Sequence, residues 1–462
     1  MTRDSLLAVS PLDGRYARYT EALSPYVSEQ ALMRGRLTVE VEYLIALAEL
    51  PQLPLSLSAT QREQLRNCYE SFDNDDAALV KRIETEGHDG RPATNHDVKA
   101  IEYFLRDSLP EGVGGQWVHF ALTSADVNNL ASRLLVKPAV NEVLIPQIRA
   151  VRDQLTEMAR KHRETPMLSR THGQAATPTT FGKECAVYAT RLGRAIGEVE
   201  RASGRLSGKL AGATGTYAAQ AVAYPDVDWP AFSKGFVEGL GLVHEPLVTQ
   251  VNPADDLAAV FDALRRVNHI LVDLAVDWWL YISQGYLGQT VTAGETGSST
   301  MPHKVNPIDF ENGEGNLSKA NSDLVFLGEY LTRSRLQRDL SGSTVKRNVG
   351  AAFAHCLIAY AKLETGLDKV VPNAQTMRAE LEATPEIIGE AVQTILRREG
   401  HEDAYERVKE LTRGQNVTLE QFHDLFDELA VSPAVRDELR ALTPTGYTGL
   451  AAELVERECN KE

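Results

Sequence analysis

The sequence is poor in cysteine. Four of its 462 residues are cysteines, and they lie far apart at Cys68, Cys185, Cys356 and Cys459. No CxxC pair and no cluster of cysteine with histidine is present. Cysteine in such small amount and at such wide spacing is typical of a reducing compartment, and it argues against a zinc site.

Long apolar runs and an excess of basic residues are also missing. No run reaches the 18 or more apolar residues of a membrane span, and residues 1–5 lack the apolar core of a secretory signal. The chain has 48 basic and 64 acidic residues, which give a net charge of −16. This charge argues against a general nucleic-acid-binding protein, although a local basic pocket could still bind an anion. We therefore expect a cytoplasmic protein with neither a membrane nor a nucleic acid as partner.

Patterns of β structure are equally hard to find. The sequence has no sustained period-two run and no alternation of strand and helix, and neither GxGxxG after a strand nor GxxxxGK[ST] occurs. Helical periodicity is clear instead. Apolar residues alternate in steps of three and four at Leu257, Val260, Leu264, Val267, Leu271, Leu274, Trp278 and Tyr281. This pattern predicts a long helix of coiled-coil type that is buried in a bundle, and an all-α fold.

Breaks in the helical pattern suggest three domains, which the chain length permits. Residues 109–115 are rich in glycine and proline, and composition shifts to short charged helices past about residue 368. We expect an N-terminal helical domain over 1–112, a central domain of long helices over 113–367, and a small helical domain over 368–462. A second three-four alternation starts at Leu144, where Pro146 is expected to kink the helix near its start.

Residues 285–307 interrupt the central helices without any apolar periodicity of their own. They bring Ser298, Ser299, His303 and Lys304 together in one segment. Loops longer than about 12–15 residues are uncommon in compact domains and are usually functional or disordered. By length alone, a surface lid without chemistry explains the segment equally well.

Other candidate residues stand at expected helix starts and turns. Thr94 or Asn95 could cap a helix, and His96 beside them fits either a capping role or a site. Thr123 and Ser124 start another helix, whose free amides could bind a carboxylate or phosphate. His172 precedes a glycine where backbone can approach a ligand closely, although an ordinary turn histidine fits too.

Residues 335–348 contain four cations among serine and threonine, namely Arg335, Arg338, Lys346 and Arg347. Arginine grips phosphate with two parallel hydrogen bonds, so the segment suits a phosphate group. The alternative is a basic surface that faces solvent.

The segment Gly297-Ser-Ser-Thr-Met-Pro-His-Lys-Val-Asn-Pro307 resembles the signature loop of the fumarase/aspartase superfamily. Residues 94–99, 123–124, 169–174 and 343–347 resemble the adenylosuccinate lyase family in particular. The histidine segment reads THGQ, whereas fumarase and argininosuccinate lyase resemble THLQ there. Ser-Pro-x-Asp-Gly-Arg-Tyr near the start resembles the bacterial type. The stretch 86–92 is longer than the family pattern, which could alter closure of the adjacent loop.

The resemblance implies an all-α, three-domain fold that assembles into a homotetramer with a twenty-helix core. Each active site would be shared between chains, with no metal and no organic cofactor. The implied reaction is β-elimination of fumarate in purine biosynthesis. The substrates would be adenylosuccinate, which gives AMP, and succinylaminoimidazole carboxamide ribotide.

The resemblance also assigns the site residues. His172 would be the general acid and Ser298 the general base, with Lys304 as a nearby cation. The implied substrate contacts are Arg15, Tyr16, Asn95, His96, Asp97, Thr123, Ser124, Gln250, Lys304, Asn312, Arg338, Ser343, Thr344, Val345, Lys346 and Arg347.

This reaction sets clear chemical demands. The proton removed lies next to a carboxylate and is weakly acidic, so its loss places two negative charges on one carboxylate. A base, an acid for the departing nitrogen and fixed positive dipoles are needed. Serine becomes a base only where amides and a cation favour its alkoxide. Two alternatives stay open: a sibling lyase or cycloisomerase (argininosuccinate lyase, fumarase, carboxymuconate cycloisomerase), and an inactive structural homologue.

Overall fold

The computed structural model describes residues 5–290, 301, 303–414 and 417–459. The chain forms two compact units. Unit 1 consists of Met1–Ile148, Ala195–His269 and Gly315–Ala361. Unit 2 consists of Arg149–Arg194, Ile270–Glu314 and Lys362–Glu462. The three-domain division over 1–112, 113–367 and 368–462 stays a prediction.

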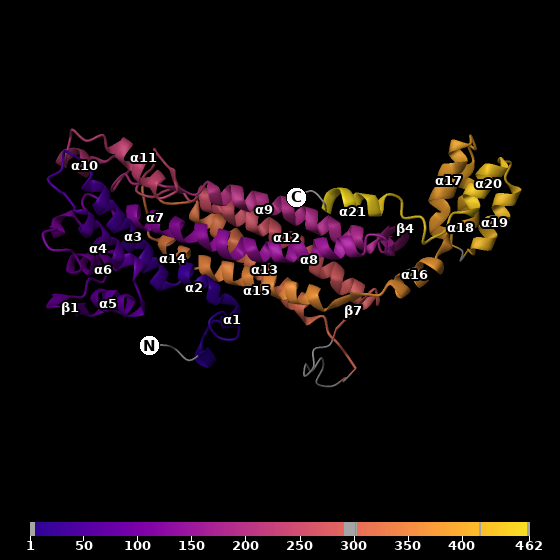
Figure 1. The fold of residues 1–462 in the computed structure, drawn as a ribbon, viewed down its shortest axis with the longest axis horizontal. Helices are drawn as coiled ribbons and strands as arrows, with labels where there is room; N and C mark the ends of the chain where they lie inside the picture. The colour runs from indigo at the N-terminus through magenta and orange to yellow at the C-terminus, as the bar shows by residue number, and fades with distance from the viewer. Residues whose placement is uncertain (1–4, 291–300, 302, 415–416, 460–462) are drawn as a thin grey trace. The chain divides into compact units, whose positions relative to one another are not determined.

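The expected all-α class is confirmed, since helices make up most of the described chain and strands occur as short pairs (Figure 1). Five long helices contribute residues to both units: α8 (Ile145–Lys161), α9 (Phe181–Gly204), α12 (Asp255–Ser283), α13 (Ile308–Leu331) and α15 (Val349–Lys369). Among the described residues, no helix combines the length and the apolarity needed to cross a membrane.

The remaining elements of unit 1 lie wholly within it. Its helices are α1 (Ala17–Thr20), α2 (Ser24–Val27), α3 (Glu29–Leu47), α4 (Ala59–Glu70), α5 (Asn74–Thr85), α6 (Asp97–Asp107), α7 (Ser124–Pro138), α10 (Ala218–Ala223), α11 (Trp229–Gly239) and α14 (Ser341–Lys346). Short 3-10 turns occupy Ser5–Leu7, Glu21–Leu23 and Gly115–Trp117. Its strands are β1 (Gly87–His88) and β2 (Arg91–Pro92), which are antiparallel, and β5 (Ser207–Gly208) and β6 (Val243–His244), which are parallel.

Unit 2 contains the other short elements. Its helices are α16 (Ala374–Glu382), α17 (Gly389–Arg398), α18 (Ala404–Thr412), α19 (Leu419–Glu428), α20 (Pro433–Arg440) and α21 (Ala451–Cys459), with a 3-10 turn at Pro385–Ile388. Its strands pair antiparallel as β3 (Pro166–Thr171) with β4 (Gln174–Thr180), and β7 (Leu287–Gln289) with β8 (Val370–Pro372).

Helix α12 follows the register that its sequence predicts. The first seven positions of the three-four alternation, from Leu257 to Trp278, are each at most 1% exposed. Fully burying a side chain such as leucine contributes roughly 1.5–3 kcal/mol. The apolar stripe of α12 is therefore a main source of core stability, and the prediction of a long buried helix is confirmed.

The kink expected at Pro146 stays a prediction, and a π-helical segment, Ala139–Leu144, lies directly before α8. It follows Pro138 at the end of α7 and precedes α8, in which Pro146 is the second residue. Proline has no N–H, so it cannot donate the backbone hydrogen bond that a regular helix would require there. π-helical turns are rare, and they are among the features at which helices bend.

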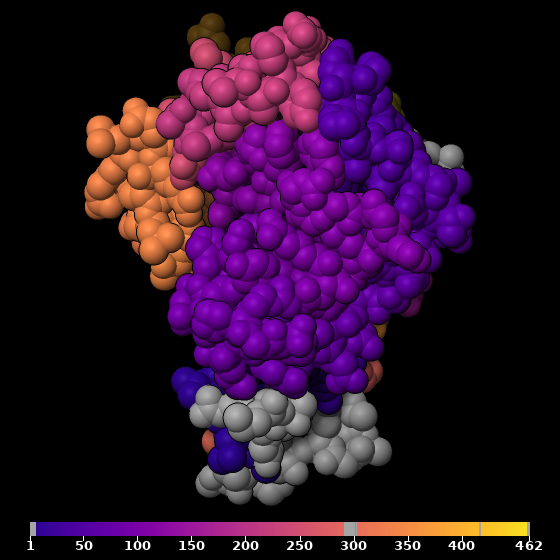
Figure 2. Space-filling view, turned by 90° about the vertical axis from the view of Figure 1, so that its left-hand side faces the viewer, coloured from indigo at the N-terminus to yellow at the C-terminus, as the bar shows by residue number. Residues whose placement is uncertain are grey.

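Packing in unit 1 joins segments that are distant in sequence. The ring of Tyr43 in α3 meets Phe232 and Phe236 of α11 at centroid distances of 6.0 and 5.8 Å. In Figure 2 the pink segment, which includes α10 and α11, lies against the purple and indigo segments of the N-terminal part of the chain. Aromatic pairs at such distances contribute beyond their buried area.

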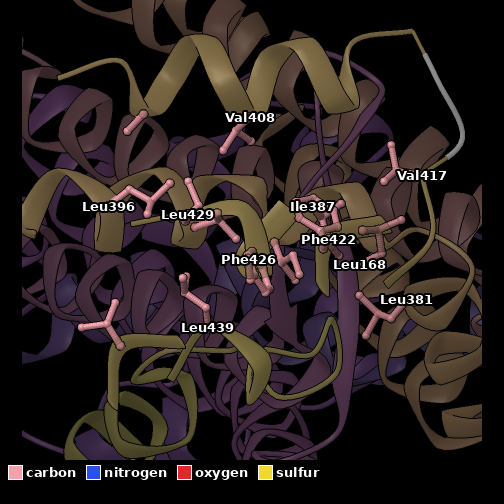
Figure 3. Close-up of a cluster of buried hydrophobic side chains, with 14 residues drawn as sticks. Leu168, Leu381, Ile387, Leu396, Val408, Val417, Phe422, Phe426, Leu429 and Leu439 are labelled. Carbon is pink, nitrogen blue, oxygen red and sulfur yellow. The ribbon is translucent and has the colours of Figure 1, made fainter. Parts of the chain in front are cut away.

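The C-terminal helices of unit 2 share an apolar cluster with one strand residue. Leu168 of β3 belongs to a buried cluster with Leu381, Phe422 and Phe426, among others (Figure 3). Thr418 and Gln421 have the three-residue spacing of a capping box, and both of its hydrogen bonds are present at the start of α19. The β3–β4 hairpin is therefore anchored at its base in the core of the C-terminal helices.

Candidate active site

His172 lies at the tip of the β3–β4 hairpin, which the sequence pattern did not predict. Thr171 pairs with Gln174, so His172 and Gly173 are the two central residues of the turn. Their φ angles are +54° and +74°. A two-residue type I′ turn needs positive φ at both positions, and glycine at the second position adopts it without steric strain. The histidine is exposed, and its ring makes no hydrogen bond to another described residue.

The hairpin has two polar attachments to the C-terminal helices of unit 2. Arg170, on β3, forms an ion pair with Glu380 of α16. Thr177, on β4, donates a hydrogen bond of 2.6 Å to Glu390 of α17. The tip that presents His172 is thus held from both strands.

The segment 285–307 is described in part, and Ser298 lies outside the described residues. Its beginning is more regular than expected, because β7 pairs with β8 and Thr290 N–H donates to Lys369 O at 2.8 Å. Lys304 is exposed, and its N–H bonds to Met301 O at 3.0 Å. Asn312 is half-buried in the second turn of α13, a helix that begins at Ile308.

In unit 1, the expected helix start at residues 94–99 is present, and the capping role considered for His96 is confirmed. His96, and neither Thr94 nor Asn95, is the N-cap of α6, and its Nδ1 accepts from Lys99 N–H at 3.2 Å. Asn95 takes a left-handed φ of +47°, a conformation that asparagine adopts more readily than most residues. Thr94 and Asn95, the smaller capping candidates, do not cap α6, because the turn at Asn95 places the cap at His96.

Asp97 is the centre of a charged group drawn from three segments. Arg36, buried in α3, donates to Asp97 Oδ2 at 2.7 Å, and Arg347 donates to the same oxygen at 3.1 Å. Arg36 also donates to Asn128 of α7 at 2.8 Å. Burial alone would raise the pKa of Asp97, but Arg36, the Val98 amide and Arg347 together hold it below its usual value. Asp97 therefore stays charged and orients both arginines.

Thr123 and Ser124 start α7 as expected, with Thr123 at the N-cap. Their position depends on Asp126, which accepts from the Thr123 N–H at 2.9 Å and from the Ala211 N–H at 3.0 Å. Asp126 also forms an ion pair of 2.7 Å with Lys209, and both side chains are fully buried. Backbone geometry at this helix start is therefore fixed by a buried charge pair.

Gln250 connects two further segments of unit 1. Its amide accepts from Arg338 Nη1 at 2.9 Å and donates to Ala213 O at 2.8 Å. Lys346 lies close enough to Arg338 and to the Arg133–Asp256 ion pair to interact with both electrostatically. Burial and the two arginines, offset in part by Asp256, lower the pKa of Lys346 to about 8. This cluster is rich in positive charge, as an anion-binding region requires.

The other predicted contacts lie at the surface of unit 1. Arg15 is exposed, and Tyr16 is half-buried before α1, where its ring meets Tyr19 at 6.4 Å. Ser343 and Thr344 are exposed in α14, and Val345 is half-buried there. Arg347 follows α14 and also pairs with Glu29 at 2.8 Å.

Sequence reasoning did not find three residues that organise these groups: Arg36, Asp126 and Lys209. Asp126 had a detectable signal, because an acidic residue three positions after Thr123 completes a capping box. Arg36 and Lys209 had none. Each is a lone basic residue in an ordinary local context, and its partner is distant in sequence.

Comparison with known proteins identifies the family of the chain. A family described as "Lyase" matches residues 14–321, and one described as "Adenylosuccinate lyase C-terminal" matches residues 334–448. The adenylosuccinate lyase of Legionella pneumophila (strain Corby) is 44% identical, covering 98% of this chain and 99% of that protein. The adenylosuccinate lyase of Escherichia coli (strain K12) is 43% identical, covering 99% of each chain.

A solved structure supports the fold independently. The fumarate lyase from Mesorhizobium sp. BNC1 superposes with a TM-score of 0.75 at 20% sequence identity, covering 96% of this chain and 98% of that one. At that identity the match speaks for the fold alone. The family matches and the relatives above 40% identity over nearly the full length lead to one conclusion: the chain is a lyase that belongs to the adenylosuccinate lyase family.

Proposed function

We propose that this chain releases fumarate from adenylosuccinate, giving AMP, and from succinylaminoimidazole carboxamide ribotide. The observation that carries the proposal is the identity of 44% to an adenylosuccinate lyase over 98% of the chain. The sequence segments that resemble this family all fall within the matched length. Sibling lyases and cycloisomerases become the weaker alternatives, because the C-terminal family that matches residues 334–448 is that of adenylosuccinate lyase.

In the proposed mechanism, Ser298 removes the proton next to the carboxylate and His172 protonates the departing nitrogen. Lys304 and backbone amides would favour the serine alkoxide. The tight turn at His172 supports its role, since a ring at an exposed hairpin tip is free to meet a substrate. Elimination then forms fumarate and the free amine of the nucleotide. No step requires a metal or an organic cofactor.

We assign the nucleotide phosphate to the basic region of unit 1. Arg338 and Lys346 lie near each other, and Arg347 is held by two carboxylates, Asp97 and Glu29. The remaining substrate contacts proposed in unit 1 are Arg15, Tyr16, Asn95, His96, Asp97, Thr123, Ser124, Gln250, Ser343, Thr344 and Val345. Asn312 is proposed as a further contact from unit 2.

A direct assay tests the proposal. Purified protein is given adenylosuccinate, succinylaminoimidazole carboxamide ribotide, argininosuccinate, malate or carboxymuconate in separate reactions. Release of fumarate is followed, and for carboxymuconate, whose cycloisomerisation releases no fumarate, consumption of the substrate is followed. We expect turnover of the two purine substrates alone. Turnover of one of the other compounds, or of none, would refute the assignment.

We also propose that the chain forms a homotetramer with sites shared between chains, and that it is cytoplasmic. Helix α12 supports the assembly, because Trp279 and Leu280 follow Val276 by three and four positions, on one face of the helix, and all three are about 40% exposed. An exposed apolar stripe on a long helix is typical of a helix–helix interface. The four free cysteines support a reducing location.

The phosphate assignment predicts a selective loss of affinity in Arg347→Ala. Removing a charge-assisted contact should weaken AMP binding by about tenfold or more. Fumarate binding should change little, because fumarate has no phosphate. Isothermal titration of each ligand measures both affinities. Arg335→Ala is the matched control, since Arg335 lies in the same segment but is largely exposed beside Asp339. Equal weakening of AMP and fumarate would argue that Arg347 holds the fold or the dicarboxylate instead.

If Lys346 contacts the phosphate, its titration should make nucleotide binding depend on pH. Its pKa is about 8 without ligand, and a bound phosphate would raise it. Proton linkage then makes AMP affinity nearly constant just below pH 8 and lowers it by up to about tenfold per pH unit above pH 8. Phosphate itself titrates near pH 6, so it does not contribute in this range. Lys346→Met should bind more weakly at pH 7 and lose the dependence above pH 8. An unchanged pH profile in this variant would exclude Lys346 as the titrating group.

A further inference from the structure

One carboxylate in unit 2 holds two segments that belong to different strand pairs. Glu380 of α16 accepts from Arg170 through Oε1 and from the Tyr286 hydroxyl through Oε2. Arg170 lies on β3, two residues before His172, and Tyr286 immediately precedes β7. Both oxygens of the carboxylate are thus engaged, each by a different segment.

The β3–β4 hairpin needs such an attachment near its tip. Its register shifts between Leu168 and Arg170, so the ladder is interrupted between the base and the turn. Leu168 is fixed on the base side by the apolar cluster of the C-terminal helices. A bulge of this kind leaves the strand beyond it more weakly constrained. Arg170 is on the tip side of the interruption, and its ion pair with Glu380 restrains the part that carries His172.

Tyr286, one of the two partners of Glu380, is held in place by several contacts. Its ring stacks on Tyr281 of α12 at 6.2 Å, and its carbonyl accepts from Asn373 N–H at 2.8 Å. Tyr286 is 1% exposed, and burial together with Glu380 raises the pKa of its hydroxyl, which therefore keeps its proton and donates. The Arg170–Glu380 pair, by contrast, is about one-third exposed and lines an open cavity of about 610 Å³ with Gln284, Gln375 and Thr376. Exposed ion pairs add little to stability, so the pair is better explained by positioning than by stabilisation.

We propose that Glu380 is a positioning residue for the general acid. From α16, Glu380 holds the tip of the β3–β4 hairpin through Arg170. Through Tyr286 it holds the start of β7, so the two segments keep a fixed position relative to each other. The inference rests on the proposed function for the role of His172, and it assigns Glu380 no contact with substrate. Because displacement of a reacting group by about 1 Å can cost a hundredfold in rate, a loosened tip should slow chemistry more than it weakens binding.

Kinetics of Glu380→Ala and Glu380→Gln test the proposal in the full-length protein. We expect kcat of Glu380→Ala to fall by about 10- to 100-fold with KM within about threefold of wild type. Glu380→Gln keeps one acceptor oxygen, so its kcat should lie between that of Glu380→Ala and that of wild type. Adding Tyr286→Phe or Arg170→Gln to Glu380→Ala should cause no further loss, since both act through the same carboxylate. Glu438→Gln is the matched control: it removes an arginine–carboxylate pair, with Arg398 at 2.5 Å, that does not touch the hairpin.

Amide hydrogen exchange provides a second readout that needs no activity. Peptides covering residues 166–180 and 286–290 should both exchange faster in Glu380→Ala, and neither should change in Glu438→Gln. A wild-type protein that releases no fumarate would refute the proposed function, while the exchange measurement would still test the link. Unchanged exchange in both peptides, or kcat within threefold of wild type at an unchanged unfolding temperature, would overturn the role of Glu380.

Discussion

Mixing two inactive variants, His172→Ala and Ser298→Ala, should restore about a quarter of wild-type activity. Each variant alone should be inactive, because each lacks one of the two proton-transfer groups. If the histidine and the serine of one site come from different chains, random reassembly of a closed oligomer places an intact histidine beside an intact serine in about one site of four. The experiment unfolds the two proteins together, refolds them and measures fumarate release.

The mixing ratio sharpens this test. Active sites should follow the product of the two chain fractions, so a three-to-one mixture should recover somewhat less than an equal one, about a fifth of wild type. Each variant refolded alone is the control for residual activity, and refolded wild type is the control for yield. A site built within one chain could not recover at any ratio, because every chain carries one lesion. Persistent inactivity of verified mixed oligomers would therefore exclude shared sites.

Lys209→Met should cost roughly 3–5 kcal/mol in free energy of unfolding, the cost of removing one partner of a buried ion pair. Both Lys209 and Asp126 are fully buried, and their contact is 2.7 Å. Without the lysine, the Asp126 carboxylate would remain buried with only the Thr123 and Ala211 amides as donors. Lys209 would also no longer donate to Gly212 O at 3.0 Å, so the turn after β5 should loosen. Urea unfolding followed by circular dichroism measures the change.

Two further variants identify the cause of that loss. Lys81→Met makes the same chemical change at an exposed helix position, where the pair with Glu84 spans 2.8 Å, and it should cost less than about 1 kcal/mol. The double variant Lys209→Met/Asp126→Asn removes the second charge but keeps an acceptor, so it should regain part of the stability. A double variant no more stable than Lys209→Met would show that lost packing, and not a stranded charge, dominates.

The same buried pair links stability to the candidate site. Asp126 orients the Thr123 N–H, and Thr123 and Ser124 are among the proposed substrate contacts. A variant that survives the loss of Lys209 should therefore also bind substrate poorly. Glu380 in unit 2 and Asp126 in unit 1 have similar structural roles. Each is a carboxylate that touches no substrate in the proposed mechanism but fixes a segment that does.

The sequence by itself determined the features that depend on local patterns. The three-four alternation of α12 placed its buried face correctly from Leu257 to Trp278, because helical periodicity is a property of neighbouring residues. The helix start at Thr123 and the capping box at Thr418 followed from side chains that bond to the backbone within one turn. The eleven residues from Gly297 to Pro307 indicated the superfamily before any geometry was known.

Tertiary structure alone decided which distant residues meet. The β3–β4 hairpin has no alternation of apolar and polar residues from which it could be predicted, because its base is buried on both faces and its tip is polar. Asp97 meets Arg36 and Arg347, which are 61 and 250 positions away, and no spacing rule relates residues at such separations. Likewise, Glu380 meets Arg170 and Tyr286 only because of the way α16 packs. Local propensity fixes where helices begin and end, whereas the partners of a buried or shared charge depend on how those helices pack.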